Sequence, residues 1–176
     1  MTCSFCAFIA ERTKPGQEDF PFESPEIVGW FDAHPVSPGH FLLVPRRHVG
    51  KLTDMTSEEV ARLFSALRHA KSLIESLDVA RMRKLYGALR AQRVSENSPL
   101  FIEKVLEHPC LGQKPHGYNH GVNEGVAGGQ TVDHLHWHII PRYIGDVPDP
   151  RGGVRAVFPK LANYQAPFYK TITSKT

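Results

Sequence analysis

The spacing of apolar positions changes along the chain, and each spacing predicts a different secondary-structure element. Residues 27–31 and 40–44 are apolar runs separated by a turn rich in proline and glycine, which predicts an antiparallel pair of strands. From Thr56 to Leu77, apolar side chains recur every three or four positions, and Thr56 with Glu59 fits a capping box. This segment therefore predicts one long helix with its apolar stripe in the core.

Residues 80–114 show a weaker pattern. Met82, Leu85 and Leu89 indicate further helix. The residues expected to break it are Asn97, Pro99, Pro109 and Gly112. We expect a solvated helical excursion here, although its aromatic and basic residues would also be able to cover a substrate. Another strand is expected from about Tyr118 to Asn123.

The segment 134–140 alternates histidine with apolar residues. Successive side chains of a β-strand point to opposite faces, so a strand here would have one imidazole face and one apolar face. Imidazoles serve as general acids, bases, nucleophiles and metal ligands near neutral pH. The imidazole face would hold His134, His136 and His138, and the apolar face Leu135, Trp137 and Ile139.

A glycine-rich loop, residues 123–132, comes directly before this segment. Glycines let the backbone approach an anion closely, and successive amides in such a turn form an anion-binding concavity. Next to three histidines, the loop indicates a phosphate held beside a nucleophile. The candidate phosphate contacts are Asn123, the Thr131 hydroxyl and the Val132 amide. Arg142, Arg151 and Arg155 follow and would either bind further phosphates or lie on the solvated surface.

The middle histidine, His136, suits a nucleophile because it has an imidazole on either side. A neutral imidazole that attacks phosphorus splits one displacement into two easier ones, and a flanking histidine can donate a proton to the leaving group. Two alternatives stay open at this point. The histidines could be structural, or they could form a His-x-His metal site of the metallohydrolase or cupin kind.

Composition narrows the class of protein. The chain has 176 residues, 41% of them hydrophobic, which is enough for a single domain over 1–176. A net charge of +3 is too small to indicate nucleic-acid binding, and no apolar run has membrane-spanning length. We expect a cytoplasmic protein that binds neither nucleic acid nor membrane. Three cysteines without an export signal favour metal binding by Cys3 and Cys6 over a disulfide framework.

The segment 134–140 resembles the His-φ-His-φ-His-φ-φ signature of the histidine triad (HIT) superfamily. Residues 31–40, 44–49 and 123–132 resemble the first hairpin of that family, the segment after it and the phosphate loop. The resemblance implies an α+β HIT fold, a mostly antiparallel sheet with one long helix, in a homodimer that joins its sheets. Around that core, 1–24 would be an arm that binds zinc, 80–114 a helical insertion and 144–176 a C-terminal extension.

The resemblance also implies roles for single residues. His136 would form a nucleotidyl-histidine, His138 would contact the phosphate and leaving group, and His40 would lie near the catalytic imidazole and orient it. Asp32 would bind the ribose hydroxyls and Trp30 would border the base. The phosphate contacts implied are Asn123, Gly129, Gln130, Thr131 and Val132.

The third triad position separates branches of the family, since the uridylyltransferase branch has Gln where this chain has His138. We therefore expect a hydrolase that cleaves a phosphoanhydride of a (di)nucleoside polyphosphate, with Arg151 on an outer phosphate. A purine nucleoside phosphoramidase and a nucleotide-binding regulatory protein with incidental activity remain alternatives.

Bacterial members of similar pattern bind a structural zinc. The matching residues here are Cys3, Cys6, His48 and His134. Such a Cys2His2 site is closed, so it would hold the arm against the sheet and would not activate water. Cys110 has no partner in this scheme, and no organic cofactor is expected.

Overall fold

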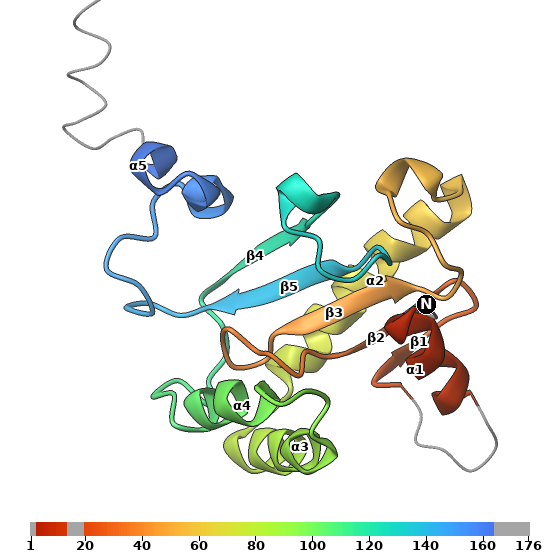
Figure 1. Cartoon of the computed structure of the whole chain (residues 1–176). Helices are drawn as coiled ribbons and strands as arrows, with labels where there is room; N and C mark the ends of the chain where they lie inside the picture. Colours follow the sequence, from red (N-terminus) through yellow and green to blue (C-terminus); the bar gives the residue numbers. More distant parts are fainter. Residues whose placement is uncertain (1–2, 14–19, 164–176) are drawn as a thin grey trace, which may run out of the picture.

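A five-stranded antiparallel sheet organises the chain in the computed structural model, which describes residues 3–13 and 20–163 (Figure 1). The strands lie in the order β1-β2-β3-β5-β4. Their bounds are β1 Phe22–Glu23, β2 Ile27–Phe31, β3 Phe41–Pro45, β4 Gly117–Val122 and β5 Trp137–Arg142. The expected α+β class with a mostly antiparallel sheet is confirmed.

The long helix α2 (Ser57–Glu75) covers one face of the sheet. Alternate residues of β2 and β3, such as Ile27 and Leu43, pack against its stripe in one buried cluster. The capping box is present, since the Thr56 hydroxyl accepts a hydrogen bond from the Glu59 amide and the Glu59 carboxylate accepts one from the Thr56 amide. The sequence prediction for this helix is therefore confirmed.

The opposite face of the sheet carries α1 (Ser4–Arg12). We expected a polar arm over 1–24, and this was wrong for residues 4–12. Phe5, Phe8 and Ile9 pack against the other alternate strand residues, Val28 and Leu42 among them. A single helical turn brings these apolar positions to one side, which makes the segment amphipathic. Residues 14–19 of the arm lie outside the described part of the chain.

The insertion forms two helices, α3 (Val79–Gln92) and α4 (Ser98–Leu106). They pack against each other beside one end of the β2–β3 hairpin (Figure 1). The expected solvated excursion is corrected, because the pair has its own buried cluster: Met82, Tyr86, Ile102, Val105 and Leu111. Pro99 does not break a helix either. It occupies the first turn of α4, where the missing amide proton is not needed.

The histidine segment is only partly a strand, because β5 begins at Trp137 and not at His134. Before that point the backbone bonds elsewhere: the Leu135 amide donates to the Val49 carbonyl, and the His134 amide donates to the Val132 carbonyl. After β5 come the short helices η3 (Gly153–Val157) and α5 (Pro159–Ala162), and residues 164–176 of the extension lie outside the described chain. No helix among the described residues is both long and apolar enough to cross a bilayer.

Candidate active site and metal centre

A cavity of about 530 Å3 lies on the α1 face of the sheet. Trp30, Leu42 and His138 line it from facing positions on three adjacent strands, β2, β3 and β5. His136 lines it as well, with its ring centroid 4.9 Å from that of His138. His134 does not line this cavity. The three imidazoles therefore divide between two sites, which the alternating pattern left open.

His136 is 6% exposed, and one hydrogen bond fixes its tautomer. Its Nδ1 lies 2.8 Å from the carbonyl oxygen of His134, and a carbonyl only accepts, so Nδ1 carries the proton. In the neutral ring the lone pair is then on Nε2. The Phe5 ring packs edge-on against this imidazole at a centroid distance of 5.2 Å. His136 is thus held in the state that a nucleophile requires.

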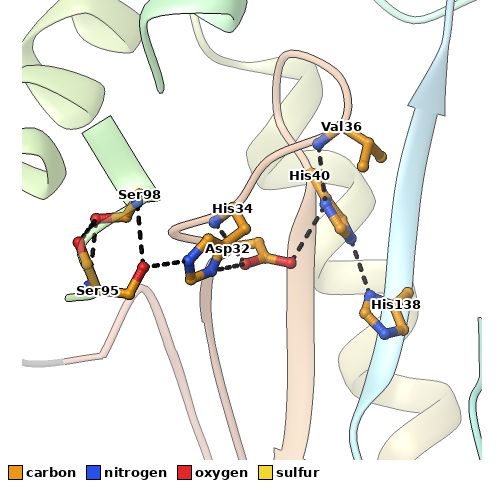
Figure 2. A network of polar contacts seen from close by, with 7 residues as sticks. All are labelled: Asp32, His34, Val36, His40, Ser95, Ser98 and His138. Carbon is orange, nitrogen blue, oxygen red and sulfur yellow. Dashed lines mark hydrogen bonds and ion pairs between the residues drawn. The ribbon is translucent and has the colours of Figure 1, made fainter. Parts of the chain in front are cut away.

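His138 is oriented by His40, whose Nε2 lies 3.0 Å from His138 Nδ1 (Figure 2). The Val36 amide donates to His40 Nδ1 at 3.4 Å, whereas the Asp32 carboxylate, also 3.4 Å from that nitrogen, lies outside hydrogen-bond geometry. In the tautomer that accepts from Val36, the neutral His40 ring carries its proton on Nε2. His138 then accepts at Nδ1 and carries its own proton on Nε2. That Nε2 is buried and has no hydrogen-bond partner among the described residues. The resemblance placed His40 beside the nucleophile, whereas its hydrogen bond goes to His138.

Burial keeps both of these imidazoles neutral near pH 7. The pKa of His138 is lowered to about 4, mainly by desolvation and in addition by the charges on His40 and His136. Desolvation also lowers the pKa of His40, although the nearby carboxylate of Asp32 acts against it. The hydrogen bonds described above therefore belong to neutral rings.

Asp32 stands at the cavity wall and links two histidines (Figure 2). Its Oδ1 accepts a hydrogen bond from the His34 amide at 2.8 Å, and its Oδ2 lies 3.4 Å from His40 Nδ1. A carboxylate has about four lone-pair positions, so both oxygens retain capacity to accept from a ligand hydroxyl.

Only part of the glycine loop reaches the cavity. Thr131 and Val132 line it, whereas Asn123, Gly129 and Gln130 do not. The Gln130 side chain closes the loop instead, because its amide accepts from the Gly125 amide and donates to the Gly50 carbonyl. Within the described chain, Gln130 is thus committed to loop structure.

The structure does not bring Arg151 to the cavity. Its guanidinium donates two hydrogen bonds to the Asp149 carboxylate, at 2.8 and 3.1 Å, and its side chain is 60% exposed. Arg142 is likewise engaged, by Asp146 and Asn119. Helix η3, in the segment after β5, contacts β4, and neither arginine lines the cavity, so sequence proximity to the histidines did not produce spatial proximity.

Several residues of the cavity wall were absent from the sequence prediction. Among them are Phe5 and Phe8 from α1, and Leu89, Gln92 and Val94 from the insertion. The spacing of Phe5 and Phe8, three positions apart, is a local signal of an amphipathic helix. Nothing in the local sequence indicates that the end of α3 lines the same cavity as the triad, because that position depends on tertiary packing alone.

Four potential metal ligands gather beside this cavity: Cys3, Cys6, His48 and His134, with ligand atoms all within 4.8 Å of one another. The distance from Sγ to Nδ1 is 3.3 Å for Cys6–His48 and 3.5 Å for Cys3–His134. Tetrahedral zinc with ordinary Zn–S and Zn–N bonds sets such ligand atoms about 3.5 Å apart. The donor set and its spacing fit zinc.

The orientation of His134 supports the same assignment. Its Nε2 lies 2.8 Å from the Pro45 carbonyl oxygen and therefore carries the proton, which leaves the lone pair on Nδ1, facing the cysteines. A carbonyl on the distal nitrogen is the usual second contact of a ligating histidine. A zinc ion here would join α1 to the sheet.

The His-x-His metal alternative fits the geometry less well. Among the described residues, a second group of potential ligands is Asp32, His40 and His138. The two imidazole nitrogens of this group point at each other in a hydrogen bond, and His136 belongs to neither group. The side chains of His136 and His138 therefore do not form a shared metal site.

Comparisons with known proteins agree with this geometry. A family model described as the HIT domain matches residues 16–145. An AP-4-A phosphorylase of Mycobacterium tuberculosis is 30% identical over 68% of this chain, and an asymmetrical bis(5'-nucleosyl)-tetraphosphatase of Schizosaccharomyces pombe is 31% identical over 64%. The chain covers 44% and 42% of these two relatives, less than half of each.

A solved structure described as a zinc-bound histidine triad family protein, from Mycobacterium smegmatis, is also similar. It is 28% identical, with a TM-score of 0.50 over 85% of each chain. The triad histidines, the sheet and the family model thus lead to one conclusion. The chain belongs to the HIT domain family.

Proposed function

We propose that this protein hydrolyses a phosphoanhydride bond of a dinucleoside polyphosphate through a nucleotidyl intermediate on His136. The observation that carries the proposal is the tautomer of His136, whose hydrogen bond to the His134 carbonyl directs the Nε2 lone pair into the cavity. The names of the relatives support the substrate class, since both refer to dinucleoside tetraphosphates or their cleavage.

In the first step, His136 Nε2 attacks the phosphorus and forms a P–N bond while the P–O bond to the leaving group breaks. The leaving oxygen takes the electron pair and accepts a hydrogen bond from His138 Nε2–H. The Nδ1–H bond to the His134 carbonyl stabilises the positive charge that develops on the His136 ring.

In the second step, water attacks the same phosphorus. A P–O bond forms, the P–N bond breaks with its electron pair returning to His136 Nε2, and the proton of the water passes to solvent. A mononucleotide leaves and the neutral imidazole is restored. A cavity of about 530 Å3 is within the range that holds one nucleotide.

The low pKa of His138, about 4, favours a polyphosphate over a phosphoramidate. A leaving phosphate departs as an anion and needs only a hydrogen bond. A leaving amine needs a proton, and a neutral ring with this pKa is a poor source of one near pH 7.

We also infer that zinc on Cys3, Cys6, His48 and His134 is structural, and that two chains pair into a homodimer. Strand β4 is an edge strand: among the described residues it pairs only with β5, so its outer backbone groups are available to a second copy. Light scattering at micromolar concentration would test the dimer.

The decisive experiment is acid-free quenching of a reaction with diadenosine tetraphosphate, followed by mass spectrometry of the protein. We expect a nucleotidyl adduct on the peptide that contains His136. His136→Ala should remove the adduct and turnover while mononucleotide binding persists, and His69→Ala, on the exposed side of α2, should change neither. Turnover by His136→Ala would refute the mechanism, and binding without any turnover by the native chain would favour the regulatory alternative.

A further inference from the structure

The α3–α4 insertion contributes three side chains to the cavity: Leu89, Gln92 and Val94. Arg93, between the last two, has φ of +45° and ends α3 in the left-handed conformation. Helix α3 therefore ends at the cavity, and the chain changes direction there.

The insertion is anchored at this position by contacts to the β2–β3 hairpin. Its Tyr86 is 0% exposed, and the Tyr86 hydroxyl accepts a hydrogen bond of 2.8 Å from the Gly39 amide in the β2–β3 turn. The Ser95 hydroxyl lies 2.6 Å from His34 Nε2, next to Asp32 (Figure 2). The ring of Phe101 packs edge-on against His34 at 5.5 Å. The insertion is thus anchored to the same hairpin that supplies Asp32.

The insertion lies at the end of the cavity away from the imidazoles. A neighbouring cavity of about 380 Å3 shares Trp30, Leu89 and Gln92 with the first, but its lining contains neither His136 nor His138. With the phosphorus at His136, as the proposed function requires, a nucleoside that extends toward Trp30 would bring its base to the insertion.

Gln92 is the polar side chain among the three that the insertion supplies; it is exposed at the cavity wall, and its amide makes no hydrogen bond to another described residue. A glutamine amide offers one donor and one acceptor side by side, which matches the N6 and N7 edge of adenine. Guanine presents two acceptors on that edge, which suits arginine or lysine instead.

We propose that Gln92 is a specificity-determining residue that reads the edge of an adenine base held between Trp30 and Leu89. This proposal rests on the proposed function only for the position of the phosphate at His136. It assigns to the insertion a role in choosing the base, and it leaves the chemistry to the triad.

Calorimetric titration with AMP and GMP tests the proposal without requiring turnover. The native protein should bind AMP about tenfold more tightly than GMP. Gln92→Ala should bring the two affinities to within about twofold, and Gln92→Arg should favour GMP. The matched control is Gln113→Ala, because Gln113 bonds the Pro109 carbonyl on the same insertion and does not line the cavity. It should keep the native ratio.

Equal affinity of the native protein for AMP and GMP would overturn the proposal, as would a native ratio in Gln92→Ala. Hydrolysis of diadenosine and diguanosine tetraphosphates at equal kcat/KM would do the same while leaving the proposed function intact. AMP preference that depends on Gln92, without any hydrolysis, would sustain this inference and remove the proposed function.

Discussion

His40 Nε2 lies 3.0 Å from His138 Nδ1, although the two residues are 98 positions apart in the sequence. Through this contact the tautomer of His40, whose Nδ1 lies 3.4 Å from both the Val36 amide and the Asp32 carboxylate, determines which nitrogen of His138 carries the proton. The protonation of His138 thus depends on groups in the first hairpin (Figure 2).

Removal of that contact should lower the rate constant more than it changes binding. We expect His40→Ala to reduce kcat about tenfold, because His138 loses the partner that fixes its orientation, while KM stays within about twofold. His40→Gln retains a donor and should recover part of the loss. Steady-state kinetics on diadenosine tetraphosphate would measure kcat and KM separately. If kcat/KM fell only because KM rose, the positioning role of His40 would be contradicted.

The buried imidazoles should make folding stability depend on pH. The pKa of His138 is about 4 in the folded chain and about 6.5 when unfolded, so below pH 6.5 the unfolded state binds the extra proton. The free energy of unfolding should therefore fall as pH drops from 7 toward 4. We expect His138→Asn to reduce this fall by about 1 kcal/mol between pH 7 and pH 5, measured by urea denaturation. If the free energy of unfolding changed with pH equally in the native protein and in His138→Asn, the lowered pKa of His138 would be disproved.

Loss of zinc should lower the stability of the fold more than it lowers the rate of the reaction at phosphorus. We expect one zinc per chain by elemental analysis, and a lower Tm for Cys3→Ser and for chelated protein, since structural zinc contributes folding free energy. Cys110→Ser is the matched control, because Cys110 lies outside the ligand group, and it should leave the zinc content unchanged. Fewer than about 0.1 equivalents of zinc in untagged protein would count against the site.

Tyr86→Phe should destabilise the protein by about 1–3 kcal/mol, because the buried Gly39 amide loses its acceptor. Tyr118→Phe is the comparison: its hydroxyl bonds Glu75 at an exposed position, so its loss should cost less than half as much. Denaturant unfolding of both variants would provide the numbers. Equal losses would mean that the anchor between the insertion and the hairpin contributes little.

Diadenosine tetraphosphate should be cleaved with a higher kcat/KM than an adenosine phosphoramidate. The reason is the neutral state of His138, which serves a leaving phosphate better than a leaving amine. The phosphoramidate rate should rise as pH is lowered toward the pKa of His138, whereas the polyphosphate rate should not. Parallel assays from pH 5 to pH 8 would measure both, and a preference for the phosphoramidate at pH 7 would place the protein with the phosphoramidases.

The sequence was most informative where chemistry and periodicity coincided. The imidazoles of His136 and His138 do share a cavity, and α2 begins at its capping box as predicted. The start of β5 was predicted too early because alternation of residue types does not reveal that His134 turns toward two cysteines. The contact of Gln92 with the cavity could not be predicted, because it is set by packing between segments distant in sequence.

The first helix has two neighbours of different kinds at consecutive positions. Phe5 lies against the His136 ring, and Cys6 lies beside the Nδ1 atoms of His48 and His134. Successive residues of a helix are rotated by about 100°, so one helical turn can direct Phe5 toward His136 and Cys6 toward His48 and His134. Under the proposed function, natural variation at Phe5 should follow the shape of the nucleoside, whereas variation at Cys6 should follow retention of the proposed zinc. Relatives that abandon the metal would be free to exchange Cys6 while Phe5 is still under selection.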